Sequence, residues 1–546
     1  MMRRSLVLAL PMSLLVAALS ARDARATGVM EFPDNGSEQM GRGGAWVARA
    51  SDPLATFYNP AGLAGQDDRI TLQSNITFSH KCFTRVLAAG DQSNDSLANH
   101  GSPTFPQVCN DIAPSPGPQL GFTWRVTDRI GVGFLPLLAP SAAGSSSWPE
   151  FVNGRTPNVA APNRYLLTNA NTVLLTPTIG AGFEVANGLR LGASFQWGLA
   201  PKIHFENGAA ALNSNNLSPD ESDIKAQIDA KQMFIPGFTL GALWSPTDNF
   251  DLAGWYKWSA PIDAMGDVKT SANYFTSAVA QGNTSKVVNG DTSQGNCGIP
   301  NGANTCGSGN NAEIKVPIPM EAKLGFRFHQ PIVAGTKNSH HRDPLAQDQW
   351  DAEVDFTWAN NSAFDSVRLT FPSDAGGNGV IPVNGTGGVL PPNANIPHNF
   401  KDVLGVRLGG DFNVVPGKLA LRAGTFYETT AQDDTYQNID FSGAWRLGLA
   451  SGATYRMHVG SAEKTSAVEF SVGYGHVFYG TQDNSNPNNP GINALSGVPC
   501  NPSTSPVVNN TCTSSGTQKY RTVWPINLGT ITTTVNVINV GVSYKF

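Results

Sequence analysis

Segments that alternate between apolar and polar residues recur along this chain, and this alternation constrains its fold more than any other feature. The last segment, INVGVSYKF, places Ile538, Val540, Val542, Tyr544 and Phe546 on one face and polar or small residues on the other. Successive side chains of a strand point to opposite faces, so such a segment predicts a strand with one apolar and one polar side. The same pattern occurs at residues 70–78, 320–329, 350–358 and 468–474.

Two classes of all-β protein show this alternation, and their surroundings distinguish them. A soluble sandwich turns its polar faces to water, whereas a membrane barrel turns its apolar faces to lipid and keeps a polar interior. Aromatic residues near strand ends, a terminal Phe546 and an export signal favour the barrel. The sequence therefore predicts an all-β transmembrane antiparallel β-barrel.

Short and long connections follow each other between these segments, as the periplasmic turns and external loops of outer-membrane barrels do. Short turns are expected at 126–129, 184–188, 245–249 and 413–418. Long loops are expected near 80–117, 140–163, 204–225, 267–312, 359–398 and 481–529. This arrangement leaves about fourteen strands, an even number that returns both ends of the barrel to the periplasm.

Residues 1–26 have the features of a cleaved signal peptide. Arg3 and Arg4 precede an apolar run at 6–19, and an A-x-A cleavage site occupies 24–26. An uncleaved anchor helix is the alternative, but the apolar run is short for a membrane span. No later segment supplies about 18 consecutive apolar residues, so we expect no spanning helix.

The composition supports export and strands, and it excludes one class of partner. Charged residues make up 14% of the 546 residues, and the chain contains 57 glycines. A net charge of −5 offers no basic field for nucleic acid. We therefore expect no nucleic-acid partner.

Six cysteines fall as three sequential neighbours in loop-like sequence. Because exported chains meet oxidising conditions, we predict local disulfides within the external loops rather than a metal site. The predicted pairs are Cys82 with Cys109, Cys297 with Cys306, and Cys500 with Cys512.

Residues 27–67 lack sustained alternation and precede the first strand. Trp46, Phe57 and Tyr58 would be costly to leave exposed in a free tail. We therefore predict an N-terminal hatch, a plug folded back into the lumen, and we assign residues 68–546 to the barrel with its long loops.

The hatch carries a motif that identifies a family. GRGGAWVARASDPLATFYNPAGLAG, residues 41–65, resembles the N-terminus of the FadL-type outer-membrane transporters of long-chain fatty acids and hydrophobic compounds. The matching hatch residues are Gly41, Arg42, Asp52, Asn59, Pro60 and Ala61. The aromatic last strand and the strand count extend the resemblance over the mature chain, although Asn59 can also be read as an ordinary Asx-Pro turn.

The resemblance implies a function. Family members are monomeric barrels in the bacterial outer membrane, surrounded by its lipid, that import fatty acids or aromatic hydrocarbons. Ligand passes from an external hydrophobic groove to an inner pocket, and the hatch and a kinked third strand open an exit. We expect the same passive, hatch-gated uptake of a hydrophobic small molecule here, with lateral exit and no cofactor; Trp148 and Phe151 are candidates for the outer groove.

Residues 129–140 would form the third strand. Pro136 cannot donate to a neighbouring strand, and Gly131 and Gly133 weaken packing, so a gap is plausible there. The alternative is a proline at the frayed outer end of an ordinary strand.

Charged residues on the predicted strands should point into the lumen, because they are costly toward lipid. The expected lumen charges are Glu321, Lys323, Arg327, Asp351, Glu353 and Asp355. A turn near residue 338 would place Lys323 opposite Glu353 and Glu321 opposite Asp355. These residues either form a salt-bridge network that holds the wall or hatch, or offer Lys323 or Arg327 to a substrate carboxylate. Arg407, Arg422 and Arg446 are expected to line the lumen as well.

Enzyme signatures are absent from the sequence, and His341-Arg342-Asp343 mimics a kinase triplet without the rest of a kinase. Two other functions stay open: a general polar porin, and an adhesion or receptor barrel that acts through disulfide-clipped loops. The sequence does not identify the substrate.

One further hypothesis concerns the turn at Asn59. Pro60 presets φ, Asn59 can cap a backbone group and Ala61 leaves room for close approach. We expect Asn59-Pro60-Ala61 to anchor the hatch against the inner wall where the first strand begins.

Overall fold

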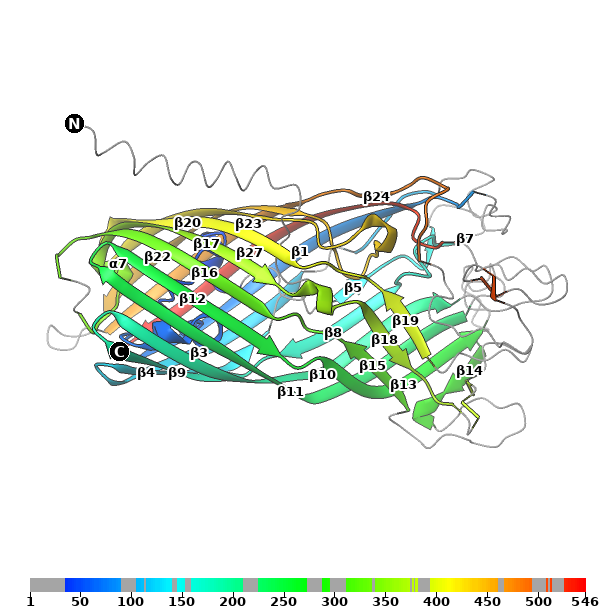
Figure 1. Ribbon diagram of the computed structural model, residues 1–546, viewed down its shortest axis with the longest axis horizontal. Coiled ribbons are helices and arrows are strands. Elements are labelled where there is room, and N and C mark those ends of the chain that lie inside the picture. Colours follow the sequence, from blue (N-terminus) through cyan, green and yellow to red (C-terminus); the bar gives the residue numbers. More distant parts are fainter. Residues whose placement is uncertain are drawn as a thin grey trace.

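A computed structural model describes residues 35–89, 105–111, 114–139, 145–152, 159–209, 224–272, 287–294, 311–335, 339–373, 376–377, 379–381, 393–459, 466–492, 507–508, 511–512 and 525–546. Its main feature is one closed antiparallel barrel (Figure 1). The predicted signal peptide at 1–26 and the first residues of the predicted hatch lie outside the described residues.

Fourteen strands form the barrel, each paired with its neighbours in chain order. They are β1 (Arg69–Arg85), β3 (Ser115–Thr127), β4 (Ile130–Leu138), β9 (Thr178–Ala186), β10 (Leu189–Ala209), β11 (Ile224–Thr247), β12 (Phe250–Ser259), β16 (Glu321–Pro331), β17 (Asp348–Ala359), β20 (Val403–Val415), β21 (Leu419–Glu428), β22 (Arg446–Val459), β23 (Ser466–Tyr479) and β27 (Gly529–Lys545). The barrel closes where β1 pairs with β27 along its whole length, from Arg69 opposite Lys545 to Arg85 opposite Gly529. The predicted fold class and strand number are confirmed.

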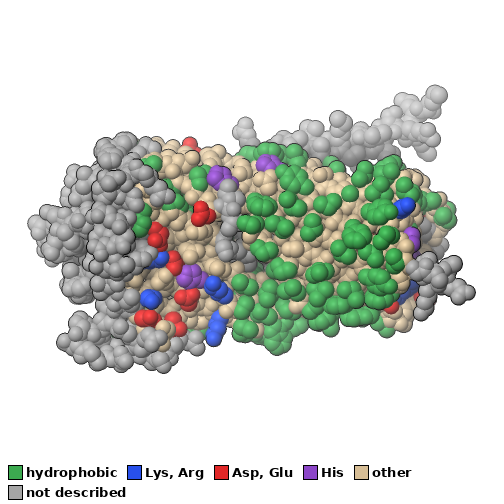
Figure 2. All heavy atoms as spheres, turned by 180° about the vertical axis from the view of Figure 1, so that it is seen from behind, with side chains coloured by type: hydrophobic (Ala, Val, Ile, Leu, Met, Phe, Trp, Pro, Cys, Tyr) green, Lys and Arg blue, Asp and Glu red, His purple; other side chains and the backbone are tan. Residues whose placement is uncertain are grey.

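The two faces of each strand follow the alternation in the sequence. On β27, Val540 and Val542 are about half exposed on the outer face, whereas Asn539 is fully buried in the interior. Figure 2 shows apolar side chains gathered in a broad band across this face of the barrel, the surface that lipid covers. Most charged side chains visible in that view lie beyond the band, at the end where Figure 1 places β13 and β14.

Regular structure continues beyond the band, where the sequence predicted long loops. β1, β10 and β11 extend into the predicted loops at 80–117 and 204–225, and further short strands extend the sheet. These are β2 (Val108–Cys109), β5 (Ser145–Ser147), β8 (Asn169–Leu175), β13 (Ile262–Ala272), β14 (Val287–Asp291), β15 (Ala312–Val316), β18 (Ser366–Thr370), β19 (Asn393–Pro397) and β24 (Gln482–Asn484). Two small hairpins stand apart, β6 (Phe151–Val152) with β7 (Val159–Ala160) and β25 (Val507–Val508) with β26 (Thr511–Cys512).

The predicted disulfide between Cys82 and Cys109 is present, with the two Cα atoms 4.0 Å apart. It joins directly opposed residues of β1 and β2, so it links two paired strands rather than the ends of a free loop. Cys297, Cys306 and Cys500 lie outside the described residues, and their pairings stay predictions.

Helices are short and few among the described residues: α2 (Ser37–Gly41), α3 (Ala55–Tyr58), η1 (Pro60–Leu63), η2 (Thr292–Gln294), α7 (Pro344–Gln347), η4 (Asn361–Ala363) and η5 (Asp434–Tyr436). In this part of the chain, none has the length and hydropathy that a helix needs to cross a bilayer. The first three form a compact unit inside the barrel, and they position the site described next.

Candidate functional site: the interior hatch and its contacts

The segment from Asn35 to Gln66 fills the barrel interior, and its side chains are almost entirely buried. Trp46, Leu54, Phe57 and Tyr58 form one apolar cluster with side chains of β4, β11 and β12, including Trp255. α2 lies against β21, β22, β23 and β27, while η1 lies against β4, β9, β10 and β11. The hatch therefore touches opposite walls of the barrel at once; its exact boundaries at residues 27 and 67 stay predictions.

The turn Asn59-Pro60-Ala61 packs directly against three glycines of the wall, Gly182 on β9, Gly192 on β10 and Gly241 on β11. We call these three residues the glycine seat. A Cβ atom at Gly192 would lie 2.3 Å from Ala61 N, and one at Gly241 would lie 2.1 Å from Asn59 Oδ1. Only residues without a side chain allow the turn to approach this closely. The anchor is thus on β9–β11, and the expectation that it lies where the first strand begins is wrong.

Asn59 performs the capping role that its position suggested. Its Oδ1 accepts a hydrogen bond from Ala61 N at 3.2 Å, which caps η1. Its Nδ2 donates to Val47 O at 2.8 Å and to Ala242 O on β11 at 3.3 Å. One amide therefore ties the turn to the rest of the hatch and to the wall.

Gly131 and Gly133 lie on β4, the third barrel strand, but they do not form a gap. Both are paired with β3 on one side and with β9 on the other. A Cβ atom at Gly131 would lie 2.0 Å from Leu63 O, and one at Gly133 would lie 2.0 Å from Thr56 Oγ1. The prediction that Gly131 and Gly133 weaken the strand is therefore wrong. Their lack of a side chain lets Leu63 and Thr56 of the hatch pack against the wall.

The irregularity in β4 lies further along, at Pro136. Regular pairing with β9 ends at Leu135 opposite Thr178, and the next bond on that side is from Thr176 N to Leu138 O at 2.8 Å. β4 is also out of register with β3 here, because Phe134 lies opposite Phe122 but Leu137 lies opposite Leu120. Pro136, which has no backbone donor, lies within this irregular stretch. The ladder between β4 and β9 is therefore interrupted at this one place among the described residues of the seam.

Arg42 connects the hatch to the barrel wall through charge. Its Nη1 lies 2.6 Å from an Asp351 oxygen and 2.8 Å from an Asp411 oxygen, and its Nη2 lies 3.1 Å from Glu353. Arg49 also pairs with Asp351 and Asp411. Arg42 and its partners are closed to solvent, so each charge depends on the others for compensation.

Two of the predicted lumen carboxylates bind the hatch backbone. Glu353 accepts from Ala48 N at 2.6 Å, and Asp355 accepts from Trp46 N at 2.9 Å and Val47 N at 3.2 Å. The remaining predicted charges are also inside: Arg327 pairs with Asp251 and Asp351 at 2.9 and 3.0 Å, and Glu321 lies 3.5 Å from Lys257. Lys323 lies over the rings of Tyr58 and Trp255.

The predicted register between β16 and β17 is wrong. Lys323 lies opposite Thr357 and Glu321 opposite Ala359, while Arg327 is the residue that faces Glu353. The reason is the connection from Pro331 to Asp348, which is not a simple turn near residue 338. It contains α7, and its described part from 339 to 347 folds back into the mouth of the barrel.

This connection, which we call the periplasmic strap (residues 339–347), is the part of the site that the sequence analysis missed. Arg342 N donates to Gly65 O at 2.8 Å, and the Arg342 side chain donates to Ala48 O at 3.0 Å. His341 lies 2.7 Å from an Asp67 oxygen, and Asp343 pairs with Arg456 and Lys545 at 2.7 Å. The strap thus contacts the hatch from the periplasmic side. The polar His-His-Arg-Asp run at 340–343, unusual for a short turn, was the sequence feature that could have indicated this role.

The charges at this mouth change the acidity of nearby groups. Although burial raises it, the His341 hydrogen bond and the Lys545 charge lower the pKa of Asp67 to about 2. Burial and the charge of Glu38 have the opposite effect on Asp52, whose pKa they raise to about 7. Asp67 is therefore held ionised, while Asp52 keeps its proton up to about neutral pH.

Beyond the hatch, toward the outer end, the interior is lined with apolar side chains. One cluster spans β10, β11, β13, β15 and β18 and includes Ile203, Ile228, Ile314 and Phe364. A second contains Phe83, Trp148 and Ile531, and partly buried Phe205 packs against both clusters. Trp148, expected in an outer groove, is buried in this second cluster, whereas Phe151 is half-buried beside Ala160.

Comparison with known proteins gives a consistent answer. Residues 17–497 match the family described as outer membrane protein transport protein (OMPP1/FadL/TodX). No curated protein sequence matches the chain.

Solved structures with the same fold include a Pseudomonas aeruginosa FadL homologue, at 17% identity and a TM-score of 0.62, covering 95% of this chain and 99% of the other. The Ralstonia pickettii toluene transporter TbuX and the Pseudomonas putida toluene transporter TodX share 12% and 15% identity, each with a TM-score of 0.52. Each of these two comparisons covers 95% of this chain and 99% of the other.

Proposed function

Because the chain belongs to the FadL/TodX family of outer membrane transport proteins, whose members are channels rather than enzymes, we propose that it admits hydrophobic small molecules by passive, hatch-gated diffusion. The observation that carries the proposal is the position of the hatch. It fills the polar half of the interior, and the apolar clusters lie between it and the outer end. Entering such an apolar interior lowers the free energy of a hydrophobic molecule. It raises the free energy of ions and polar solutes.

The proposed exit is lateral, through the wall beside Pro136. The seam between β4 and β9 is interrupted there, and Leu135 and Leu138 on the inner side belong to the apolar cluster of the hatch. The route below the hatch is unfavourable for an apolar molecule, since charged groups of Arg327, Arg342 and Asp351 occupy it. A path that turns sideways above these charges keeps the molecule in apolar surroundings until it reaches lipid.

Long-chain fatty acids and aromatic hydrocarbons are the two candidate substrate classes. Arg327 is unsuited to a substrate carboxylate, because three aspartates already surround it beneath the hatch. The sequence analysis named Lys323 and Arg327 as candidates to bind a substrate carboxylate. Lys323, which lies over the rings of Tyr58 and Trp255, is the better placed of the two for this role.

Two measurements test the proposal. Mass spectrometry of lipophilic molecules that co-purify in mild detergent identifies the class of ligand: a fatty acid would support the carboxylate role of Lys323, and neutral hydrocarbons alone would contradict it. Single-channel recording tests the plug, because a large steady current through the full chain would contradict a hatch-closed channel and favour a general porin.

A further inference from the structure

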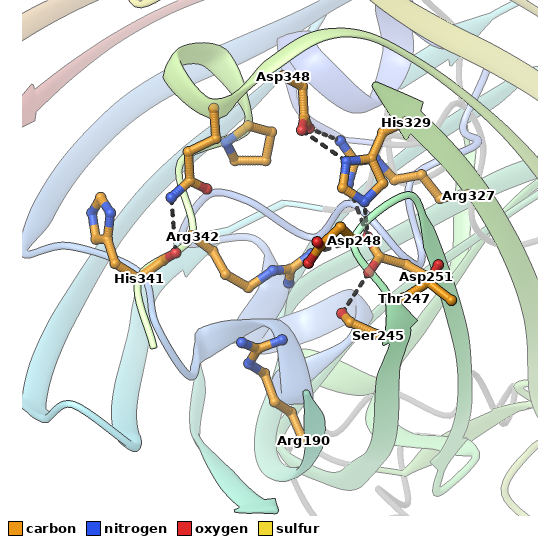
Figure 3. A pocket seen from close by; sticks show the side chains of 12 residues that line it. Arg190, Ser245, Thr247, Asp248, Asp251, Arg327, His329, His341, Arg342 and Asp348 are labelled. Carbon is orange, nitrogen blue, oxygen red and sulfur yellow. Dashed lines mark hydrogen bonds and ion pairs between the residues drawn. The ribbon is translucent and has the colours of Figure 1, made fainter. Parts of the chain in front are cut away.

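A small cavity of about 40 Å³ lies at the periplasmic mouth, between the ends of β10, β11, β12 and β16 and the strap. Three arginines extend into it: Arg190 from β10, Arg327 from β16 and Arg342 from the strap (Figure 3). Three aspartates and two histidines share its lining, so the pairing of each arginine decides where negative charge is lacking.

Arg327 differs from the other two in how well it is paired. Carboxylate oxygens of Asp251 and Asp351 lie 2.9 and 3.0 Å from its guanidinium. The guanidinium of Arg190 lies 3.8 Å from a carboxylate oxygen of Glu184. The guanidinium of Arg342 lies 3.8 Å from a carboxylate oxygen of Asp251. Charge-assisted bonds between guanidinium and carboxylate normally measure about 2.7–2.9 Å, so Arg190 and Arg342 are both poorly compensated.

Neither carboxylate is free to move closer. Glu184 accepts from His340 Nδ1 at 2.8 Å and from Gly188 N at 2.9 Å. Asp251 already accepts from Arg327 at 2.9 Å and from Ser245 Oγ at 2.5 Å. Glu184 and Asp251 therefore already accept hydrogen bonds from donors other than Arg190 and Arg342.

Arg190 also retains an unused donor. Its side chain is 2% exposed, its Nε has no hydrogen-bond partner, and its Nη2 reaches Ser339 O only at 3.4 Å. Burial and the neighbouring charge of Arg190 lower the pKa of Arg342 to about 10. A buried cation is costly when its carboxylate partner lies as far away as 3.8 Å, so the two guanidiniums leave a place for negative charge.

We propose that this cavity binds one small monovalent anion, held between Arg190 and Arg342. About 10–15 Å³ open to the centre of a water-sized sphere is enough for one water molecule, so the 40 Å³ here has room for a halide or a single carboxylate group. Asp348, the lining acid nearest Arg327, pairs with Arg327 and lies 2.7 Å from His329 Nδ1, and Asp248 accepts from Gly335 N at 2.9 Å. The bound anion joins the strap to the wall at β10 and so holds the hatch closed from below.

Bromide is the probe for the direct test. Crystals of the full chain grown in detergent with bromide should show an anomalous peak within hydrogen-bond distance of Arg190 Nε. A peak there supports the site; bromide found only on exposed lysines and arginines, with none in the cavity, overturns it.

A solution experiment distinguishes the two sources of the anion and uses matched variants. Chloride binding is followed by ³⁵Cl line broadening, with formate as the competing carboxylate. If formate reduces the ³⁵Cl broadening, the site accepts both halides and carboxylates. If formate leaves the broadening unchanged, the site accepts halides alone. Gluconate, too large for the cavity, should not compete, and competition by gluconate would overturn the proposal.

Arg190→Gln and Arg342→Gln should each weaken chloride binding by roughly tenfold or more, because each removes a charged hydrogen bond. Arg129→Gln, which changes an exposed arginine at the same mouth, is the control and should bind as wild type. Equal weakening in all three variants would overturn the proposal. If a cavity variant does not assemble, the bromide and gluconate results on the wild-type chain decide alone, and neither depends on whether hydrophobes are transported.

Discussion

Arg42 in the hatch and Asp351 on β17 form an ion pair of 2.6 Å that is entirely closed to solvent. The two residues are far apart in the sequence, and their pairing fixes the hatch to one wall while the glycine seat receives it at another. The hatch is thus held by a few specific contacts within a barrel whose own hydrogen-bond ladder does not depend on them. This separation makes it possible to disturb the hatch and leave the barrel assembled.

Arg42→Ala should release the hatch on the β17 side. It leaves Asp351, Asp411 and Glu353 with less compensation, and breaking a buried pair in this way costs about 3–5 kcal/mol. We expect faster amide exchange in residues 42–48 and a higher steady conductance, with normal heat-modifiable migration on gels. Arg368→Ala is the control, because its pair with Asp365 is about half exposed. Unchanged exchange in Arg42→Ala would show that the pair does not hold the hatch.

Gly192→Ala should displace the hatch from the glycine seat. The added Cβ would lie 2.3 Å from Ala61 N, and neither backbone can yield without a shift, which costs about 1–3 kcal/mol. Ala61→Trp should act the same way from the hatch side. In both variants we expect impaired hydrophobe uptake by a barrel that still assembles and migrates normally on gels.

Gly254→Ala is the matched control for the seat, because its nearest neighbour would be 3.5 Å away, in ordinary contact. If Gly192→Ala and Gly254→Ala transport at the same rate as wild type, close packing against Gly192 has no part in gating.

Pro136→Ala should reduce uptake. It restores a backbone donor within the irregular stretch of β4 where the seam with β9 is interrupted, so the seam can gain one hydrogen bond, worth about 1 kcal/mol. A bond of that size would lower the population of an open seam roughly fivefold. Initial rates of labelled-hydrophobe uptake measure this, with Pro116→Ala on the neighbouring β3 as the control. An unchanged rate in Pro136→Ala would exclude this seam as the rate-determining exit.

The Asp67–His341 contact predicts a loss of hatch stability in acid. The folded-state pKa of Asp67, about 2, lies below the unfolded value of about 3.9, so the ionised carboxyl stabilises the docked hatch above pH 4. This contribution should disappear as pH falls from about 4 to 2. Protease protection of the hatch, followed against pH, should lose its Asp67-dependent part in Asp67→Asn. Asp128→Asn, at an exposed turn residue, should follow wild type; identical curves for all three proteins would contradict the assignment.

The sequence predicted what depends on local pattern. Alternation along β27 determines which residues face lipid, and the even strand count follows from the lengths of the connections. The capping role of Asn59 could also be anticipated from the hatch motif, because a motif of that kind describes one compact local unit.

The features that were missed depend on contacts between distant segments. The register of Lys323 required knowing that the strap folds inward, which no strand pattern reveals. Gly131 and Gly133 look like weak points of a strand until Leu63 and Thr56 are placed against them. The role of the strap itself required seeing Arg342 beside Gly65, a contact between residues that are far apart in the chain.

Uptake of a labelled hydrophobe by cells that lack their own transporter tests the central claim most directly. Expression of this chain should accelerate entry of a long-chain fatty acid or a toluene-like compound and leave entry of a polar sugar of similar size unchanged. Faster entry of the sugar, or no change for either class of hydrophobe with the barrel correctly assembled, would contradict the account.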